Sequence, residues 1–142
     1  MINVILATHG PLAEAMLATA RMVYGELPHV FPVMLSETKG INGFQDEFAG
    51  VLQQASKGAD GVLVLCDLQS GTPWNVACHH AFAPSTTPPI AVLGGVNFPM
   101  LLLSDELKTL TDVEQAAAVL LEQTKDAVVQ ARLVETQQSD DF

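Results

Sequence analysis

The residues with the clearest chemical potential are a histidine and an aspartate that each follow a short apolar run. His9 lies just beyond the run at 2–7 (INVILA), and Asp67 directly follows the run at 61–66 (GVLVLC). A carboxylate that accepts a hydrogen bond from one imidazole nitrogen fixes the tautomer of the ring and leaves the other nitrogen unprotonated and nucleophilic. The pair therefore predicts a histidine that accepts a phosphoryl group, with Asp67 holding the ring.

Glycine and proline recur in three segments that follow apolar runs. Thr8–Pro11, Asp67–Pro73 and Gly94–Pro99 each bring a proline to or near the first turn of a predicted helix. Proline is favoured there because that position's N–H has no partner within the helix, and glycine lets the backbone approach a ligand closely. Free N–H groups at helix N-termini attract oxyanions such as phosphoryl groups. We expect phosphoryl oxygens to be bound by Gly10, Gly71, Thr72 and Asn97.

These residues must be positioned by alternating strands and helices. Short apolar runs predict strands at 2–7, 30–35, 61–66 and 90–93. Apolar residues at helical spacing predict helices within 10–25 and at 42–56, 73–82, 99–108 and 112–127. The alternation predicts an α/β fold, a doubly wound and mainly parallel sheet of strand order 2-1-3-4 flanked by helices.

Ligands of open α/β sheets bind outside the carboxyl ends of the strands. His9 and Asp67 fall at such ends, on strands that are neighbours in the predicted order. Thr72 could equally serve only as the N-cap of the helix that follows it. Pro32 cannot donate to a ladder, so the strand at 30–35 is expected at an edge of the sheet.

The last part of the chain has one clear helix signal and one ambiguous segment. Thr111 and Glu114 have the spacing of a capping box at the start of the last helix. The segment 128–134 fits either a further strand or a continuation of that helix. No repeat or linker is evident, so we expect a single domain over 1–134 and a polar tail over 135–142.

Composition narrows the class of partner. Six lysines and arginines stand against sixteen aspartates and glutamates, a formal net charge of −10, which disfavours binding to nucleic acid and to anionic membranes. Cys66 and Cys78 lack metal-ligand spacing and are expected to be reduced thiols, so we predict neither a metal nor a cofactor. No apolar stretch approaches the roughly 20 residues of a membrane span, and no basic leader precedes the first run, which indicates a cytoplasmic protein without membrane insertion.

Nucleotide-binding fingerprints are also missing. Neither G-x-G-x-x-G nor G-x-x-x-x-G-K-[ST] occurs in the sequence. We therefore expect the phosphoryl group to arrive on a protein and not as ATP.

Three motifs together are similar to those of a known family. Thr8-His9-Gly10, Asp67-x-x-x-Gly71-Thr72-Pro73-x-Asn75 and Gly95-x-Asn97-x-Pro99-Met100-Leu101 span about two-thirds of the chain. In order and spacing they resemble the EIIA component of the mannose family of the bacterial phosphoenolpyruvate-dependent sugar phosphotransferase system. One departure is Ser70-Gly71, where family members commonly carry a Gly-Gly pair.

The resemblance implies a phosphotransferase with a phosphohistidine intermediate. His9 would be phosphorylated on Nε2 by the phosphocarrier HPr, with Asp67 holding Nδ1–H, and would pass the group to an EIIB protein that serves a membrane permease during sugar uptake. EIIB would be a separate protein. The resemblance also implies a homodimer that exchanges a C-terminal strand, which would give the segment 128–134 a use.

Other functions remain open on the sequence alone. Similar domains phosphorylate a dihydroxyacetone kinase relay, and a non-catalytic module that binds an anion and regulates a partner would use the same crevice. A hydrolase built from Ser70, His9 and Asp67 lacks the G-x-S-x-G nucleophile elbow. His79 and His80 lie on a predicted helix away from the strand ends, and we expect them to be surface or packing residues.

Overall fold

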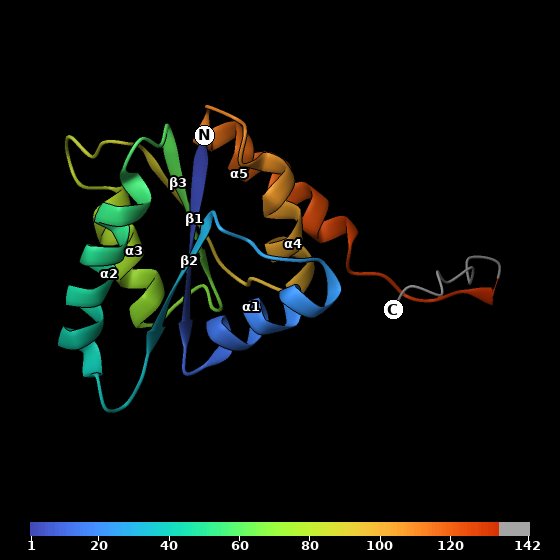
Figure 1. Cartoon of the computed structure of the whole chain (residues 1–142), viewed down its shortest axis with the longest axis horizontal. Coiled ribbons are helices and arrows are strands. Elements are labelled where there is room, and N and C mark those ends of the chain that lie inside the picture. Colours follow the sequence, from blue (N-terminus) through green and yellow to red (C-terminus); the bar gives the residue numbers. More distant parts are fainter. Residues whose placement is uncertain (134–142) are drawn as a thin grey trace.

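The computed structural model, which describes residues 1–133, is a four-stranded parallel sheet covered by helices on both faces (Figure 1). Strands and helices alternate up to the last two helices, which follow one another. In chain order the elements are β1 (Ile2–His9), α1 (Leu12–Val23), β2 (Val30–Leu35), α2 (Gly40–Ser56), β3 (Gly61–Cys66), α3 (Thr72–Ala81), β4 (Ile90–Leu93), α4 (Phe98–Leu107) and α5 (Val113–Asp126).

The strand order is β2-β1-β3-β4, which confirms the predicted fold class and order. β1 pairs in parallel with both β2 and β3, so that Val4 lies between Val30 and Leu63. All six residues of β3 are buried. Continuous apolar runs form such strands because helices cover both faces of the sheet.

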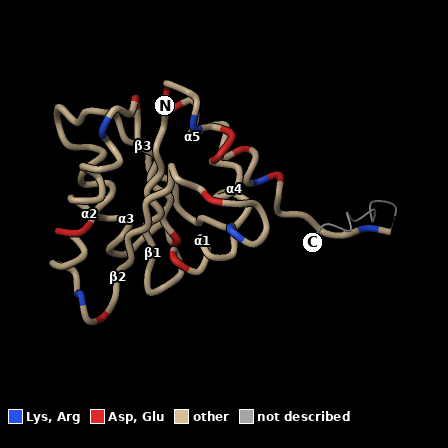
Figure 2. Tube along the Cα trace, viewed as in Figure 1, with Lys and Arg blue, Asp and Glu red and all other residues tan. Residues whose placement is uncertain are grey.

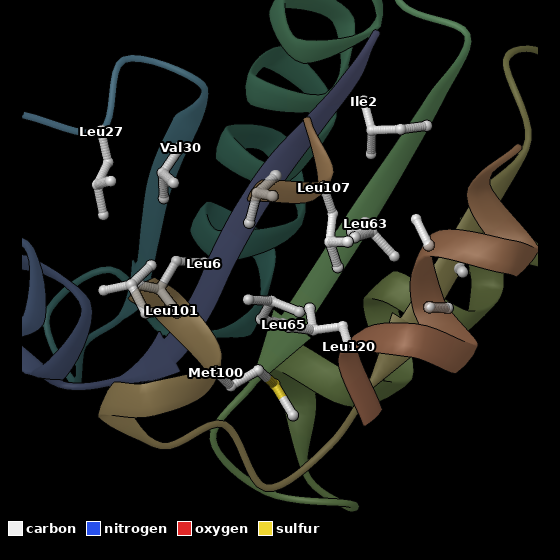
Figure 3. Packing of buried hydrophobic residues seen from close by; sticks show 14 of the residues in the cluster. Ile2, Leu6, Leu27, Val30, Leu63, Leu65, Met100, Leu101, Leu107 and Leu120 are labelled. Carbon is white, nitrogen blue, oxygen red and sulfur yellow. The ribbon is translucent and has the colours of Figure 1, made fainter. Parts of the chain in front are cut away.

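The helices divide into two layers, with α1, α4 and α5 on one face and α2 and α3 on the other (Figure 1). Successive side chains of a strand point to opposite faces, so Leu6 joins the first layer and Ile5 joins the second. Figure 3 shows the first layer, where Leu6 and Leu65 of the sheet pack near Met100 and Leu101 of α4. The two faces bury separate clusters on one shared sheet.

The site-bearing strand is longer than predicted. The apolar run ends at 7, but β1 continues to His9 because Thr8 and His9 still pair with Met34 and Leu35 of β2. β2 is an edge strand, as Pro32 predicted. The pairing holds the backbone of His9 in the sheet.

The predicted capping box at the start of α5 is wrong. Asp112, and not Thr111, is the N-cap, and its Oδ1 accepts from the N–H groups of Glu114 (3.0 Å) and Gln115 (3.3 Å). Aspartate is itself a strong N-cap residue, and the shift by one residue puts Glu114 too early in the helix to complete a box.

The chain beyond α5 leads away from the body of the molecule (Figure 1). Residues 128–132 form neither strand nor helix, and Val128 and Val129 are 73% and 80% exposed. The last residue of the ambiguous segment 128–134 and the predicted tail at 135–142 lie outside the described residues. Within residues 1–133, no helix is both long and apolar enough to cross a bilayer.

Candidate functional site

His9 and Asp67 meet at the carboxyl ends of the neighbouring strands β1 and β3. Nδ1 of His9 lies 3.0 Å from Oδ2 and 3.1 Å from Oδ1 of Asp67, and the backbone N–H of His9 donates to the same Oδ2 at 3.0 Å. The His9 side chain is 39% exposed and the Asp67 side chain 13% exposed. Because a carboxylate only accepts, the bond assigns the proton of a neutral ring to Nδ1 and leaves the lone pair on Nε2.

Gly71 lies directly against that second nitrogen. Its φ is +90°, a backbone conformation that side-chain-bearing residues rarely adopt, and a Cβ there would stand 3.1 Å from Nε2 and 3.2 Å from Cε1 of His9. The glycine thus brings the loop between β3 and α3 against Nε2 of His9, and the absence of a side chain leaves room beside that atom. A group bound to Nε2 would lie next to this loop.

The three helix starts near the site differ in how their N–H groups are used. The N-cap of α1 is Pro11, and the N–H of Ala13 is bound by Oγ1 of Thr8 at 3.0 Å. At α4, Oδ1 of Asn97 accepts from the N–H of Met100 at 3.0 Å. The N-cap of α3 is Gly71, with no side-chain cap. Among residues 1–133, the start of α3 is therefore the one of the three whose N–H groups no side chain caps.

The predicted phosphate contacts take distinct places in this arrangement. Thr72 is the first residue of α3, and the N-cap of this helix is Gly71. The alternative in which Thr72 serves only as the N-cap is therefore wrong. Gly10, with φ +57°, makes the turn after β1 and donates its N–H to the carbonyl of Leu35 at 2.7 Å. Asn97 uses its side-chain oxygen as a cap, so its amide nitrogen is the atom left for an anion. Their contacts with a phosphoryl group stay predictions.

The loop that carries Asn97 packs against the loop that carries Gly71. A Cβ at Gly94 would stand 3.1 Å from both Cα of Gln69 and Cζ3 of Trp74, and the N–H of Val96 donates to the carbonyl of Cys66 at 2.9 Å. Trp74 is half-buried at this junction. The β3–α3 and β4–α4 loops therefore support one another beside His9.

A hollow of about 530 Å³ opens beside His9 on the side of α2. Ile41 at its rim is 57% exposed. The hollow is lined by His9, Gly10, Leu35, Ser36, Glu37, Gly40 and Ile41. His9 and Gly10 were predicted site residues, but the other five lining residues were not predicted, because only the register of β2 against β1 brings Leu35 opposite His9.

His79 and His80 stand apart from this edge, as expected. They lie on the last turns of α3, and both line a hollow of about 500 Å³ between α2 and α3 that contains neither His9 nor Asp67. The ring of His80 stacks 5.4 Å from that of Phe48, and burial together with His79 lowers the pKa of His80. Burial also raises the pKa of Cys66 to about 12, so the thiol beneath the site stays protonated.

Comparison with known proteins places the chain in a family. Residues 3–120 match the model of the EIIA-man family, described as the PTS system fructose IIA component. The sorbose-specific EIIA component of the phosphotransferase system of Klebsiella pneumoniae is 35% identical over 115 residues, which cover 78% of this chain and 78% of that protein. The corresponding component of Lacticaseibacillus casei is 27% identical over 100 residues, 70% of this chain and 69% of that protein.

Solved structures agree with the sequence matches. The mannose/sorbose-specific IIA subunit of Enterococcus faecalis superposes with a TM-score of 0.78 at 33% identity, covering 92% of this chain and 95% of that one. The phosphotransferase system component EIIA of Streptococcus agalactiae shares the fold, with a TM-score of 0.80 at 23% identity over 92% of this chain and 97% of that one. The family model covers most of the chain, and the chain therefore belongs to the EIIA-man family of sugar phosphotransferase system components.

Proposed function

We propose that this EIIA component is a cytoplasmic phosphoryl carrier that accepts a phosphoryl group from phospho-HPr on His9 and passes it to an EIIB protein and its membrane permease during sugar uptake. The observation that carries the proposal is the contact of Nδ1 with Asp67 while Nε2 faces Gly71. This arrangement supplies a nucleophilic nitrogen with space beside it.

The transfer needs no change of protonation at His9. The Nε2 lone pair attacks the phosphorus, the bond between phosphorus and the donor atom breaks as the new N–P bond forms, and the donor atom keeps that electron pair. Nδ1–H stays bonded to Asp67, whose charge stabilises the ring as it gives up electron density. Transfer to EIIB repeats the exchange in the other direction. Positioning and electrostatics account for most of the catalysis of such transfers.

The uncapped start of α3 supports the proposal on the anion side. The N–H of Thr72 follows Gly71 directly, whereas Pro73 has no N–H and the N–H of Asn75 donates to the carbonyl of Gly71, so the Thr72 amide is the group at this helix start best placed for a phosphoryl group on Nε2. Lys39 lines a hollow with Gly10, but its Nζ donates to the carbonyl of Met34 and pairs with Glu47. Backbone dipoles are thus the better source of attraction for phosphoryl oxygens in a chain of net charge −10.

The names of the relatives favour a sugar permease over a dihydroxyacetone kinase relay as the destination. Two relatives are called sorbose-specific EIIA components, and one solved neighbour is a mannose/sorbose-specific subunit. Neither the regulatory anion-binding module nor the Ser70 hydrolase gains support from a specific observation.

We propose in addition that the carrier is a homodimer that exchanges its C-terminal segment. The exposed Val128 and Val129 and the edge strand β4 support this. No charged residue occurs from Leu68 to Ser104, a stretch that includes α3 and β4 (Figure 2). Two copies that each carry a net charge of −10 repel one another least where such an uncharged region meets its equivalent.

Intact-mass spectrometry at alkaline pH tests the carrier function. The protein is incubated with phosphoenolpyruvate, Enzyme I and HPr, as wild type and as His9→Ala, Asp67→Ala and Asp67→Asn variants. We expect one acid-labile phosphate on the wild type, none on His9→Ala and slowed addition in both Asp67 variants. Added EIIB should then discharge the wild type. An unmodified wild type in the presence of phosphorylated HPr would refute HPr as the donor.

A further inference from the structure

Thr8 is the buried polar residue that directly precedes His9. It is 0% exposed, and its Oγ1 accepts the N–H of Ala13 at 3.0 Å. Pro11, the N-cap of α1, has no side-chain atom that can accept a hydrogen bond. Thr8 therefore caps α1 from the end of β1, and the bond spans the turn that contains His9 and Gly10.

Besides the contact of His9 Nδ1 with Asp67, three hydrogen bonds donated by backbone N–H groups hold that turn, and each attaches it to a different element. The N–H of His9 donates to Asp67 after β3, the N–H of Gly10 donates to Leu35 of β2, and the Thr8–Ala13 bond ties β1 to α1. The first two bonds restrain the strand side of the turn, and the third restrains its helix side.

We infer that Thr8 is a positioning residue for phosphoryl transfer, whose hydroxyl oxygen holds the β1–α1 turn so that Nδ1 of His9 stays on Asp67 and Nε2 stays beside Gly71. The inference rests on the proposed carrier function for its kinetic consequence, but not for its structural one. A misplacement of about 1 Å at a reacting group can slow a reaction by about a hundredfold. Because Thr8 is 0% exposed, it cannot touch a partner protein, so its loss should change kcat and not KM.

The experiment compares Thr8→Val, which keeps the shape but removes the acceptor, with Thr8→Ser, which keeps the acceptor. The matched control is Thr124→Val, because Thr124 is also buried and its Oγ1 donates to the carbonyl of Leu120 within α5, away from the site. Long-range ¹H–¹⁵N spectra of the unphosphorylated proteins report the tautomer of His9, and rates at varied concentrations of phospho-HPr report kcat and KM.

We expect Thr8→Val to show mixed His9 tautomers and a kcat lowered about ten- to a hundredfold at unchanged KM. Thr8→Ser and Thr124→Val should keep the Nδ1–H tautomer and a kcat near that of the wild type. A wild-type tautomer and kcat in Thr8→Val would overturn the inference, as would equal losses in Thr8→Ser and Thr8→Val. If no protein takes phosphate from HPr, the carrier function fails, while the tautomer measurement still decides the role of Thr8.

A second variant covers the case in which Thr8→Val folds poorly. The double variant Thr8→Val/Pro11→Ser provides a serine at the N-cap of α1 and so restores a local cap without the link to β1. We expect it to regain helix stability while the His9 tautomers stay mixed. Recovery of the wild-type tautomer would mean that an ordinary cap suffices and that the link from β1 is not needed.

Discussion

Gly71 combines a positive φ angle with a close approach to Nε2 of His9. In a Gly71→Ala variant the new methyl group would stand 3.1 Å from Nε2 of His9 on a backbone of φ +90°, and it would occupy space that the phosphoryl group needs. We expect phosphorylation to fall by about a hundredfold or more, because the reacting atoms could no longer approach in line.

The same mass-spectrometric time course measures this loss against a matched control. Gly58→Ala places alanine at φ +68°, two residues beyond the end of α2, with no atom of the described residues within 4 Å of the new Cβ. The variant should lose about 1 kcal/mol of stability, because a residue with a Cβ is strained in the left-handed conformation, but it should not lose phosphorylation. Equal phosphorylation rates in the two variants would show that the crowding at Nε2 is unimportant.

At the scale of single residues, the sequence predicted the contact between His9 and Asp67 but not its surroundings. His9 and Asp67 could be paired because each follows a strand in a foreseeable strand order. The contact of Gly71 with Nε2 depends on one loop dihedral angle, and the Thr8–Ala13 bond depends on the angle between β1 and α1. Neither quantity has a periodic signal in the sequence.

Among the elements, α5 offers a direct test of which residue caps it. Asp112→Ala removes the acceptor of two N–H groups and should lower the stability of the protein by about 1 kcal/mol. Thr111→Ala removes no cap bond and should cost much less. Thermal unfolding of both variants decides between them, and a larger loss in Thr111→Ala would restore the capping box predicted from the sequence.

A buried histidine joins β2 to α4 and makes stability depend on pH. His29 precedes β2, its Nε2 donates to Oγ of Ser104 (3.1 Å), and its buried Nδ1 has no hydrogen-bond partner among the described residues. Burial lowers the pKa of His29 to about 4, although Asp105 at 3.8 Å opposes the shift and Lys108 adds to it. His29 is thus protonated near pH 6.5 in the unfolded chain but only near pH 4 in the folded protein.

The sign of the effect follows from that difference. Below about pH 6.5 the unfolded chain binds more protons at His29, so the free energy of unfolding should fall by about 1.4 kcal/mol per pH unit down to about pH 4. Urea unfolding between pH 7.5 and 4.5 measures the slope. His29→Gln should remove this part of it, and an unchanged slope in that variant would assign the loss to other groups.

The elements were the best predicted level of the structure. The strands at 30–35, 61–66 and 90–93 have the predicted bounds, because each is an apolar run with a clear break at both ends. β1 is longer than its apolar run because its last residues pair with β2. The N-cap of α5 is Asp112, one residue later than predicted. Strand pairing and the choice between adjacent cap residues are settled by contacts that a single sequence does not display.

At the scale of the whole molecule, the proposed exchange of C-terminal segments predicts that the dimer can be lost without unfolding the monomer. Removal of residues 128–142 should abolish the dimer while leaving thermal unfolding of the body nearly unchanged, since Val128 and Val129 are largely exposed. Removal of 135–142 alone should leave the dimer intact. Light scattering after gel filtration measures both, and a dimer that survives the longer truncation would place the contact elsewhere.

The junction of the β3–α3 and β4–α4 loops has an optical consequence. Trp74 is the one tryptophan of the chain, and it lies three residues from Gly71 and packed against Gly94. A phosphoryl dianion arriving on His9 would change the electric field at the indole, so its emission should shift with each round of charge and discharge. If the protein is the proposed phosphoryl carrier, its native fluorescence would record its phosphorylation state in a stopped-flow instrument without any label.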